Sequence, residues 1–462
     1  MAVLALRSVA EATGGTVLCA DPELSVERFA IDSRSIRGGE LFFAIRGPHH
    51  DGHRFVDDVF RKGAAAAVVS RDIGVERPAV RVADTTAALR VLARSVRETW
   101  GGTVVGVTGS CGKTTSKEMI RVAVEGSRPL LASRGNLNNL YGLPLTLLRV
   151  LPEHEVAVLE MGISTPDEMT ELARIAGPDV MVMLNVAAVH LAHFESVDAI
   201  ATAKGAALAV MGPRGTFVYN QDDARLRRLA RGFAGRTLSF GLDPGGGADV
   251  VGVDVDESGE GIAASVRVDG AEQRLVLPVA GRHNLMNALA ALAAARALDV
   301  DLSASVRRLA SFIPPGQRGD RLRLTGDLTV WDESYNSNPE AMRAVLATLR
   351  VTRPIGRRVL VCGDMKELGA DEADAHRRLA PRVADAGVDL FVGVGPLAAL
   401  TVDSLESEPA VATHACDDAR DAAVSVPGWV RDGDLVVVKG SRSMNMERVV
   451  EALVAARGRA DA

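Results

Sequence analysis

Short apolar runs alternate with amphipathic segments along most of the chain. In the first 100 residues, apolar runs at Leu41–Ile45, Ala66–Ser70 and Ala79–Val82 predict strands, and a helical pattern covers Ala87–Thr99. Strands that alternate with helices are typical of a parallel sheet covered by helices. The amino-terminal part therefore predicts a small α/β unit.

The same alternation continues from Thr103. Buried-type strands are predicted at Val104–Val107, Val156–Glu160 and Val180–Asn185, with helices between them. The stretch Asp243–Gly270, rich in Gly, Asp and Val, predicts an insertion that contains a hairpin. This part of the chain predicts a doubly wound, mostly parallel sheet.

Two breaks divide the pattern, Gly101-Gly102 as a hinge and Ile313–Gly316 as a second boundary. Beyond the second break, strands are predicted at Leu328–Asp332, Arg358–Gly363, Leu390–Val394 and Asp434–Lys439. We therefore expect an α/β protein of three domains: a small one at 1–100, a central one at 101–313 and a Rossmann-like one at 314–462.

The most informative segment is a glycine-rich turn that follows the strand at 104–107. It reads Gly109, Ser110, Cys111, Gly112, Lys113, Thr114, Thr115. Backbone N–H groups of such a turn, at a helix N-terminus, bind polyphosphate. We expect Lys113 to reach the β- and γ-phosphates and the Thr114 hydroxyl to hold Mg²⁺. Val107 stands where the general P-loop pattern has Gly, so the match is to a shorter form; the strand–turn–helix context disfavours a chance turn.

Three further residues near this loop could carry chemistry. Glu160 ends a buried-type strand, where a second Mg²⁺ ligand belongs, although a capping or surface carboxylate has the same pattern. His190 follows the next strand, and a lone His is more often structural than a ligand. Lys204 lies on an Ala-rich helical stretch, and its plain interpretation is a solvated lysine.

Composition narrows the class of protein. The 462 residues are 47% hydrophobic and have a net charge of −6, which argues against broad nucleic-acid binding. The four cysteines show no Cys-x-x-Cys spacing, so neither a disulfide framework nor a zinc site is indicated. No long apolar stretch predicts a membrane span, and Met1–Ala10 does not resemble a signal peptide. We expect a cytoplasmic monomer.

Polar residues gather at several other predicted element ends. Asn284 and Asn287 would share one helix face and could pair with adenine, although capping by Asn fits the spacing equally well. Arg318 follows the Pro-Pro-Gly break and suits closure over a γ-phosphate. Asp332–Pro339 is denser in Asp, Tyr and Asn than a turn requires, and Lys439–Ser443 suits a carboxylate or phosphate ligand.

A series of motifs appears in one order along the chain: Asp32-Ser33-Arg34, Gly39–Phe43, Gly47, Asp51-Gly52-His53, Thr108–Thr115, Asn136–Asn139, Gly142–Pro144, Glu160–Gly162, His190, the block 281–288, Asp332–Pro339, Gly363–Gly369 with His376, and Lys439–Met444. Taken together, the series resembles the Mur ligase family nearly from end to end. The last two motifs are similar to the carboxy-terminal signature of the dipeptide-adding member of that family.

The resemblance implies an activity and a division of labour. The family couples ATP to amide formation: a carboxylate attacks the γ-phosphate, and an amine then attacks the acyl phosphate. For the dipeptide-adding member, the partners are UDP-MurNAc-tripeptide and D-Ala-D-Ala, in peptidoglycan precursor synthesis. The amino-terminal domain would bind the uridine nucleotide substrate, the central domain would bind ATP, and the carboxy-terminal one would be a Rossmann-like ligase domain.

The resemblance also implies roles for individual residues. Two Mg²⁺ ions would be held with the help of Thr114, Glu160, His190 and a carbamylated Lys204. Lys113, His190, Lys204 and Arg318 would be catalytic. Further nucleotide contacts would come from Asn284, Asn287, Arg318, Asp332, Tyr335 and Asn336. Substrate contacts would come from Ser33, Arg34, Phe43, Asp51, Gly52, His53, Asn138, Asn139, Lys439, Ser441 and Arg442.

Two alternatives stay open at this point. One is another Mur-type amino-acid ligase or a specialised-metabolism paralogue, which the two carboxy-terminal motifs disfavour. The other is a nucleotide-binding regulator without catalysis. Ala192 and Ala206, which stand where the family usually has acids, favour the regulator, whereas Lys113, Glu160, His190 and Arg318 oppose it.

Overall fold

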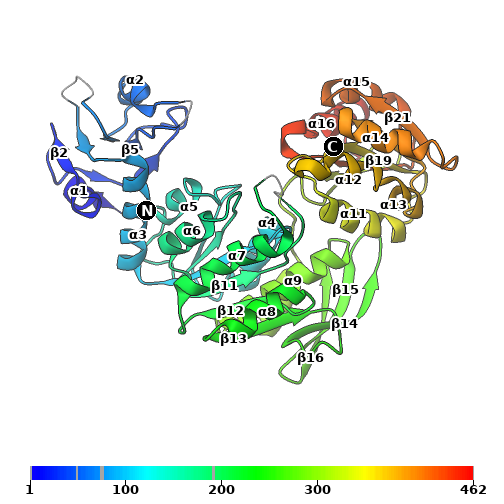
Figure 1. Cartoon of the computed structure of the whole chain (residues 1–462), viewed down its shortest axis with the longest axis horizontal. Coiled ribbons are helices and arrows are strands. Elements are labelled where there is room, and N and C mark those ends of the chain that lie inside the picture. The colour runs from blue at the N-terminus through cyan, green and yellow to red at the C-terminus, as the bar shows by residue number, and fades with distance from the viewer. Residues whose placement is uncertain (1–2, 48–49, 73–76, 190–192, 461–462) are drawn as a thin grey trace.

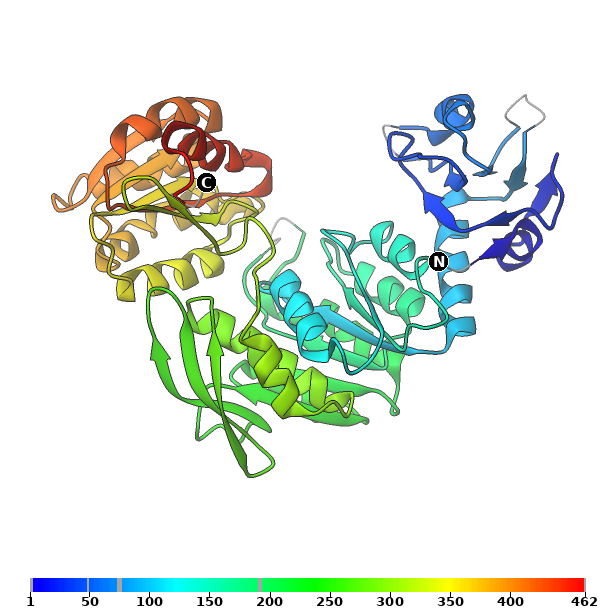
Figure 2. The same ribbon diagram turned by 180° about the vertical axis from the view of Figure 1, so that it is seen from behind.

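The computed structural model describes residues 3–47, 50–72, 77–189 and 193–460. Three large sheets follow one another along the chain, and their units form an arc with the central unit in the middle (Figures 1 and 2). Each sheet lies inside one of the expected ranges, and we propose residues 100 and 313 as the domain boundaries.

The amino-terminal sheet has five strands in the order β2-β7-β6-β5-β4, of which only β2 is antiparallel to its neighbour. The strands are β2 Thr16–Leu18, β4 Arg28–Ala30, β5 Glu40–Phe43, β6 Ala66–Val69 and β7 Ala79–Arg81; β1 Leu4–Ala5 pairs separately with β3 Ser25–Val26. Helices α1 Leu6–Thr13 and α2 Val56–Arg61 and the short η1 Gly52–Phe55 complete the unit. The three predicted strands are confirmed.

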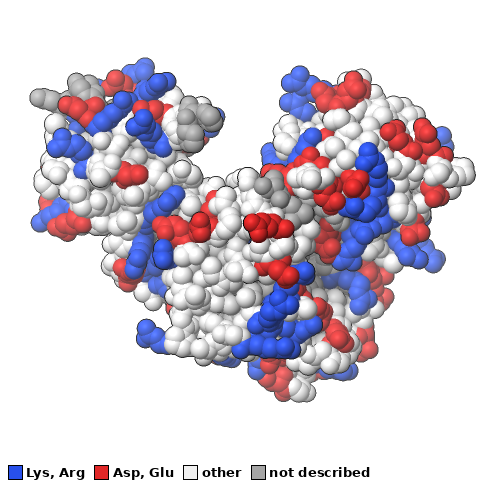
Figure 3. Space-filling view, viewed as in Figure 1, with Lys and Arg blue, Asp and Glu red and all other residues white. Residues whose placement is uncertain are grey.

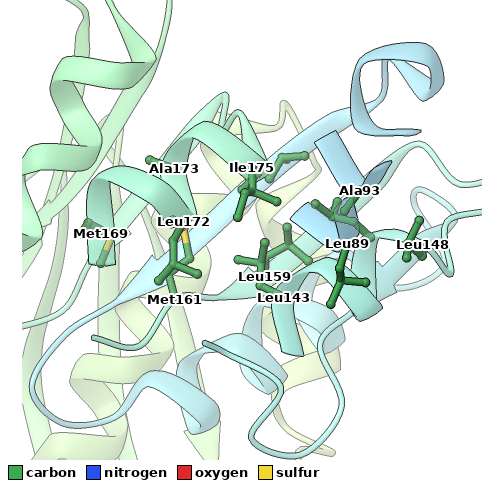
Figure 4. Close-up of a cluster of buried hydrophobic side chains, with 14 of the residues drawn as sticks. Leu89, Ala93, Leu143, Leu148, Leu159, Met161, Met169, Leu172, Ala173 and Ile175 are labelled. Atoms are coloured by element: carbon green, nitrogen blue, oxygen red, sulfur yellow. The ribbon is translucent and has the colours of Figure 1, made fainter. Parts of the chain in front are cut away.

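Helix α3 (Thr85–Trp100) connects the amino-terminal sheet to the central unit. Asp84 caps it by accepting hydrogen bonds from Thr86 N and Ala87 N, and Gly101, at φ 69°, ends it. Its apolar face enters the core of the central unit, where Leu89 and Ala93 lie beside Leu143 and Leu148 (Figure 4).

The central sheet has nine strands in the order β16-β15-β14-β13-β12-β11-β8-β10-β9. The strands are β8 Thr103–Thr108, β9 Leu130–Ala132, β10 Val156–Glu160, β11 Val180–Met183, β12 Thr216–Asn220, β13 Arg236–Gly241, β14 Val250–Glu257, β15 Ile262–Val268 and β16 Ala271–Leu277. Pairing is parallel from β9 to β14 and antiparallel from β14 to β16. The mostly parallel sheet and its hairpin insertion are thus confirmed.

Helices cover both faces of the central sheet (Figures 1 and 2). They are α4 Lys113–Val124, α5 Gly142–Leu147, α6 Glu168–Ala176, α7 Val197–Met211, α8 Ala224–Gly232, α9 Arg282–Ala297 and α10 Leu302–Leu309. Helix α9 is buried along most of its length because its alanine side chains allow α4 and the sheet to pack closely around it.

The carboxy-terminal sheet has six strands in the order β17-β18-β22-β19-β20-β21, and only β17 is antiparallel. The strands are β17 Asp320–Leu324, β18 Leu328–Glu333, β19 Arg358–Gly363, β20 Leu390–Val394, β21 Ala412–Cys416 and β22 Leu435–Lys439. The helices are α11 Pro339–Val351, η2 Gly369–Asp371, α12 Glu372–Arg377, α13 Ala380–Asp385, α14 Pro396–Leu405, α15 Ala419–Trp429, η3 Arg442–Met444 and α16 Glu447–Arg457.

Charges of both signs are mixed on the face seen in Figure 3. Among the described residues, every helix is too short or too polar to span a bilayer.

Candidate active site

The glycine-rich turn lies between the carboxyl end of β8 and the start of α4, as its sequence predicts. Gly112 caps α4 with φ 82°, a conformation that favours glycine. A Cβ at this position would lie 2.5 Å from Asn287 Oδ1 on α9. Both the backbone conformation and the packing therefore require glycine here. Thr115, in the first turn of α4, is buried.

Asn185, directly after β11, fixes the shape of the turn. Its Oδ1 accepts a hydrogen bond from Cys111 N at 2.9 Å, and its Nδ2 donates to Cys111 O at 3.1 Å. A second link forms where the Ser110 hydroxyl donates to Ala187 O and accepts from Ala187 N. The turn is thus held from the neighbouring strand end.

The half-buried Lys113 and the buried Lys204 meet at the same carbonyl of the turn. Lys113 Nζ donates to Gly109 O at 2.7 Å, and Lys204 Nζ, from α7, approaches this oxygen at 3.4 Å. Burial, and next the positive charge of Lys113, holds the pKa of Lys204 well below its usual range. Burial also lowers the pKa of Lys113, and the charge of Arg318 adds to that effect.

Glu160, at the end of β10, forms a buried network with two predicted site residues. Its carboxylate accepts from Thr114 Oγ1 at 2.7 Å and from Asn138 Nδ2 at 2.8 Å. Its backbone N–H donates to Ser133 Oγ, and Ser133 O in turn accepts from the buried Lys117 Nζ. The two oxygen ligands predicted for a metal therefore lie in direct contact.

His190 and Ala192 lie outside the described residues. Elsewhere in the described ranges, no group of three or more His, Cys, Asp or Glu side chains could hold a metal ion.

Helix α9 presents its two asparagines to the turn. Asn287 Nδ2 lies 3.4 Å from Asn284 Oδ1, which confirms that the two share one helix face. Asn287 Oδ1 also accepts from Ser116 Oγ on α4 at 3.0 Å, and Asn284 Nδ2 donates to Ala280 O. The two asparagines therefore lie beside the glycine-rich turn.

The carboxy-terminal unit contributes cations around one aromatic ring. The Arg318 guanidinium lies 3.7 Å from the ring centroid of Tyr335, and that of Arg442 lies 5.7 Å from it. Arg442 also forms an ion pair with Glu447 at 3.0 Å. Arg318 itself is close enough to Lys113 to affect its pKa.

The buried Lys439, at the end of β22, donates to Asn336 O at 2.9 Å and pairs with Glu333 at 3.3 Å. Ser441 Oγ accepts from Lys366 N at 2.8 Å. Burial raises the pKa of Asp332, which accepts two hydrogen bonds from Ser334.

One contact joins the carboxy-terminal unit directly to the glycine-rich turn. Cys111 Sγ lies 3.4 Å from Oδ1 of Asn338, the residue that caps α11. The loop that follows β8 in the central sheet therefore meets the loop that follows β18 in the carboxy-terminal sheet.

The predicted uridine-substrate residues lie on the amino-terminal unit, at the other end of the arc (Figure 1). Arg34 pairs with Asp32, and Ser33 O accepts a hydrogen bond from Lys62, the residue that follows α2. Gly52 packs against the backbone of β5, where a Cβ would come within 2.8 Å of Ala44 C. Asp51 accepts from His53, whose ring also accepts from Ser70 N.

Two predicted substrate contacts need revision. Phe43 is 0% exposed within the core of the amino-terminal unit, so its side chain supports the sheet and is not available to a substrate in this structure. Asn139 uses Oδ1 to accept from Tyr141 N and Gly142 N at the start of α5, which is a capping role.

The sequence assigned no individual role to three residues that hold the site together, although Asn338 lies within the motif Asp332–Pro339. Asn185, Ser133 and Asn338 all follow strands or precede helices, and each holds a backbone group or residue of the site. A search for polar residues at every strand end would have found the first two. No local pattern in the sequence predicts that Asn338 contacts a loop of another unit.

Comparison with known proteins identifies the family. The model described as the Mur ligase middle domain matches residues 107–295, the Mur ligase, glutamate ligase domain matches 317–442, and the Mur ligase family, catalytic domain matches 26–97.

The UDP-N-acetylmuramoyl-tripeptide–D-alanyl-D-alanine ligase of Bacillus subtilis is 30% identical over 457 residues, which cover 97% of this chain and 98% of the relative. A crystal structure of MurF from Acinetobacter baumannii superposes with a TM-score of 0.90 at 30% identity, covering 98% of this chain and 99% of that one. MurF ligase from Thermotoga maritima in complex with ADP gives a TM-score of 0.82 at 30% identity, with coverage of 93% and 98%. The chain belongs to the Mur ligase family, as its motifs predict.

Proposed function

We propose that this chain is an ATP-dependent ligase that joins D-Ala-D-Ala to UDP-MurNAc-tripeptide. The observation that carries the proposal is the meeting of Lys113, Thr114 and Glu160 at the carboxyl edge of the central sheet, with Asn338 of the carboxy-terminal unit against the same loop. In the reaction, a substrate carboxylate oxygen attacks the γ-phosphorus and ADP leaves. The amine then attacks the acyl carbon, and phosphate leaves.

Electrostatics supports this assignment. A carboxylate and a triphosphate repel each other, so their approach requires fixed positive charge in a site with little water. Lys113 supplies one half-buried cation, and Arg318 supplies a second cation from the carboxy-terminal unit. Stacking on Tyr335 restrains the Arg318 guanidinium and lowers the entropy that it loses on binding phosphate.

A Mg²⁺ ion fits the oxygen donors of this site. Thr114 and Glu160 offer a hydroxyl and a carboxylate in contact, and Mg²⁺ in phosphate-transfer sites is held by few protein ligands together with phosphate oxygens. When bound, the ion would neutralise charge on the phosphates. The second Mg²⁺ and the ligand role of His190 stay predictions.

Lys204 is proposed to carry a carbamate. Its buried amine has a strongly lowered pKa, so the neutral form that reacts with CO₂ is more accessible than for a solvated lysine. The amine nitrogen forms the new bond to carbon and releases a proton, which leaves an anionic oxygen group beside Lys113. Intact-mass and peptide mass spectrometry in bicarbonate buffer would detect the added mass of CO₂.

The two outer units are proposed to hold the substrates. Arg34 and Asp51 on the amino-terminal unit would contact the uridine nucleotide, and Lys439 and Arg442 on the carboxy-terminal unit would contact the D-Ala-D-Ala carboxylate. Cation side chains suit that carboxylate. We propose that the protein acts as a monomer.

The test is phosphate release from ATP in the presence of UDP-MurNAc-tripeptide and each candidate amine. The proposal expects release and product mass with D-Ala-D-Ala, and neither with D-Ala or single L-amino acids. Release only with a single amino acid would show another Mur-type ligase. Absence of release with every amine would show a nucleotide-binding regulator.

A further inference from the structure

A large trough lies along the free edge of the central sheet, outside the site described above. Strand β9 is the outermost strand at one end of the sheet order. The trough, about 1040 Å³ in volume, is lined by the end of α4, by residues 126–134 and by residues in the range 149–154. We call it the β9 trough.

The backbone of β9 offers unused hydrogen-bonding groups to this trough. Toward β10, Pro129 O accepts from Glu155 N at 2.8 Å and Ser133 N donates to Val158 O at 3.0 Å. Parallel pairing uses alternate residues of a strand, so Leu130 and Ala132, which lie between these positions, direct their N–H and C=O groups away from β10. An exposed edge of this kind is a template for another strand.

The charges around the edge are unbalanced. Arg121 is neutralised by Glu118 at 2.8 Å and by Glu125 at 2.9 Å. In contrast, Arg128, Arg134 and Arg149 line the trough, and their guanidinium groups make no hydrogen bond or ion pair with any residue in the described part of the chain.

Arg149 is the arginine of this group whose environment most clearly disfavours its charge. It is half-buried, and burial followed by the charge of Arg134 lowers its pKa. A half-buried guanidinium next to another cation is an unfavourable arrangement that an added carboxylate would relieve.

We propose that the β9 trough binds an extended, acidic peptide segment of a partner protein, which adds a strand to β9 and pairs its carboxylates with Arg128, Arg134 and Arg149. Main-chain pairing would give affinity, and the arginines would select acidic side chains. A second copy of this chain is disfavoured because two such edges would bring arginines against arginines. A small anion would leave the strand edge unused.

The test measures binding of a fluorescent octapeptide of alternating Glu and Val to the full-length protein by anisotropy. We expect saturable binding that weakens about tenfold in Arg134→Ala and in Arg149→Ala, since one charge-assisted hydrogen bond accounts for a factor of this order. Arg350→Ala is the matched control, because Arg350 is exposed, lies on α11 and is unpaired among the residues that the structure describes.

A second variant separates strand pairing from charge. Ala132→Pro removes one outward N–H and keeps every arginine, and proline is tolerated at an edge position whose N–H faces solvent. With the fold verified by circular dichroism, we expect this variant to bind the peptide at least several-fold more weakly. Unchanged affinity would overturn the pairing.

Other outcomes would assign the β9 trough differently. No saturable binding of the Glu peptide, or equal binding of its Lys counterpart, would refute the proposal. Competition by pyrophosphate at matching affinity would indicate a small-anion site, and self-association abolished by Arg134→Ala would indicate a second copy. None of these measurements uses ATP, so failure here is independent of the ligase assay.

Discussion

Asn185→Ala should loosen the phosphate loop without removing any group proposed to touch the nucleotide. In the wild-type chain, the Asn185 amide holds both polar atoms of the Cys111 peptide, at 2.9 and 3.1 Å. Alanine removes both bonds. The Cys111 N–H and C=O then have to find water or reorient, and the concave arrangement of N–H groups around the phosphate position is weakened.

The size of the effect follows from these two bonds. A hydrogen bond in a folded protein contributes about 1 kcal/mol net, so the pair contributes about 2 kcal/mol. If the loop relaxes in the free variant and must be reordered by the ligand, this loss appears in binding, as an increase in Kd of about 30-fold. If the loop keeps its shape, the same loss appears as a lower free energy of unfolding.

Two measurements check this reasoning. Titration calorimetry with Mg-ADP gives the change in Kd, and urea unfolding gives the change in stability. Asn185→Asp is the informative companion, because it still accepts from Cys111 N but cannot donate to Cys111 O and adds negative charge beside the loop. Wild-type affinity together with wild-type stability in Asn185→Ala would refute the assignment of Asn185 as the clamp of the loop.

Four further changes have defined outcomes. Lys113→Ala should abolish phosphate release, because Lys113 is the lysine of the loop itself; a variant with full activity would contradict the phosphate-loop assignment. Lys204→Ala should lose activity and partly recover it with added short carboxylates, whereas a wild-type rate without rescue would leave Lys204 as a structural residue. Lys204→Met should unfold at a higher urea concentration than wild type near neutral pH, because burial disfavours the charged form of the wild-type lysine. That advantage should shrink as the pH rises toward 10.5, the ordinary lysine value. Asp434→Asn should cost about 3 kcal/mol of stability at neutral pH, because it leaves the partly buried Arg357 without its carboxylate. Burial disfavours the charged form of Asp434, but hydrogen bonds from Arg357 and from backbone N–H groups outweigh burial and hold the pKa of Asp434 below 3.8. The stabilisation is therefore present above pH 3.8 and is lost as the pH falls through the lower folded-state pKa. Urea unfolding at several pH values would show this loss.

Much of the architecture was predictable because it depends on local patterns. The strands at β8, β10 and β11 are continuous apolar runs, and each is buried on both sides in the sheet. By contrast, β9 is three residues long and sits at an edge, so its sequence carries no period that would distinguish it from a loop.

The candidate site was predictable to the extent that it lies on strand ends. Lys113, Thr114 and Glu160 come from neighbouring parallel strands, whose carboxyl ends meet at one edge of the sheet. Contacts between units were not predictable in this way. The approach of Asn338 to Cys111 depends on how two sheets pack, and the burial of Phe43 depends on cores forming on both faces of β5.

The position of α3 has a consequence for substrate reach. Arg97 and Trp100, near its end, donate to backbone carbonyls of the central unit, while the body of the helix packs on α1 of the amino-terminal unit. Sixteen helical residues correspond to a rod of about 24 Å. Since this rod is fastened to the central unit, any swing of the amino-terminal unit must pivot before Thr85 or slide α1 across α3. The length and tilt of a single helix thus set the distance between the amino-terminal unit and the glycine-rich turn.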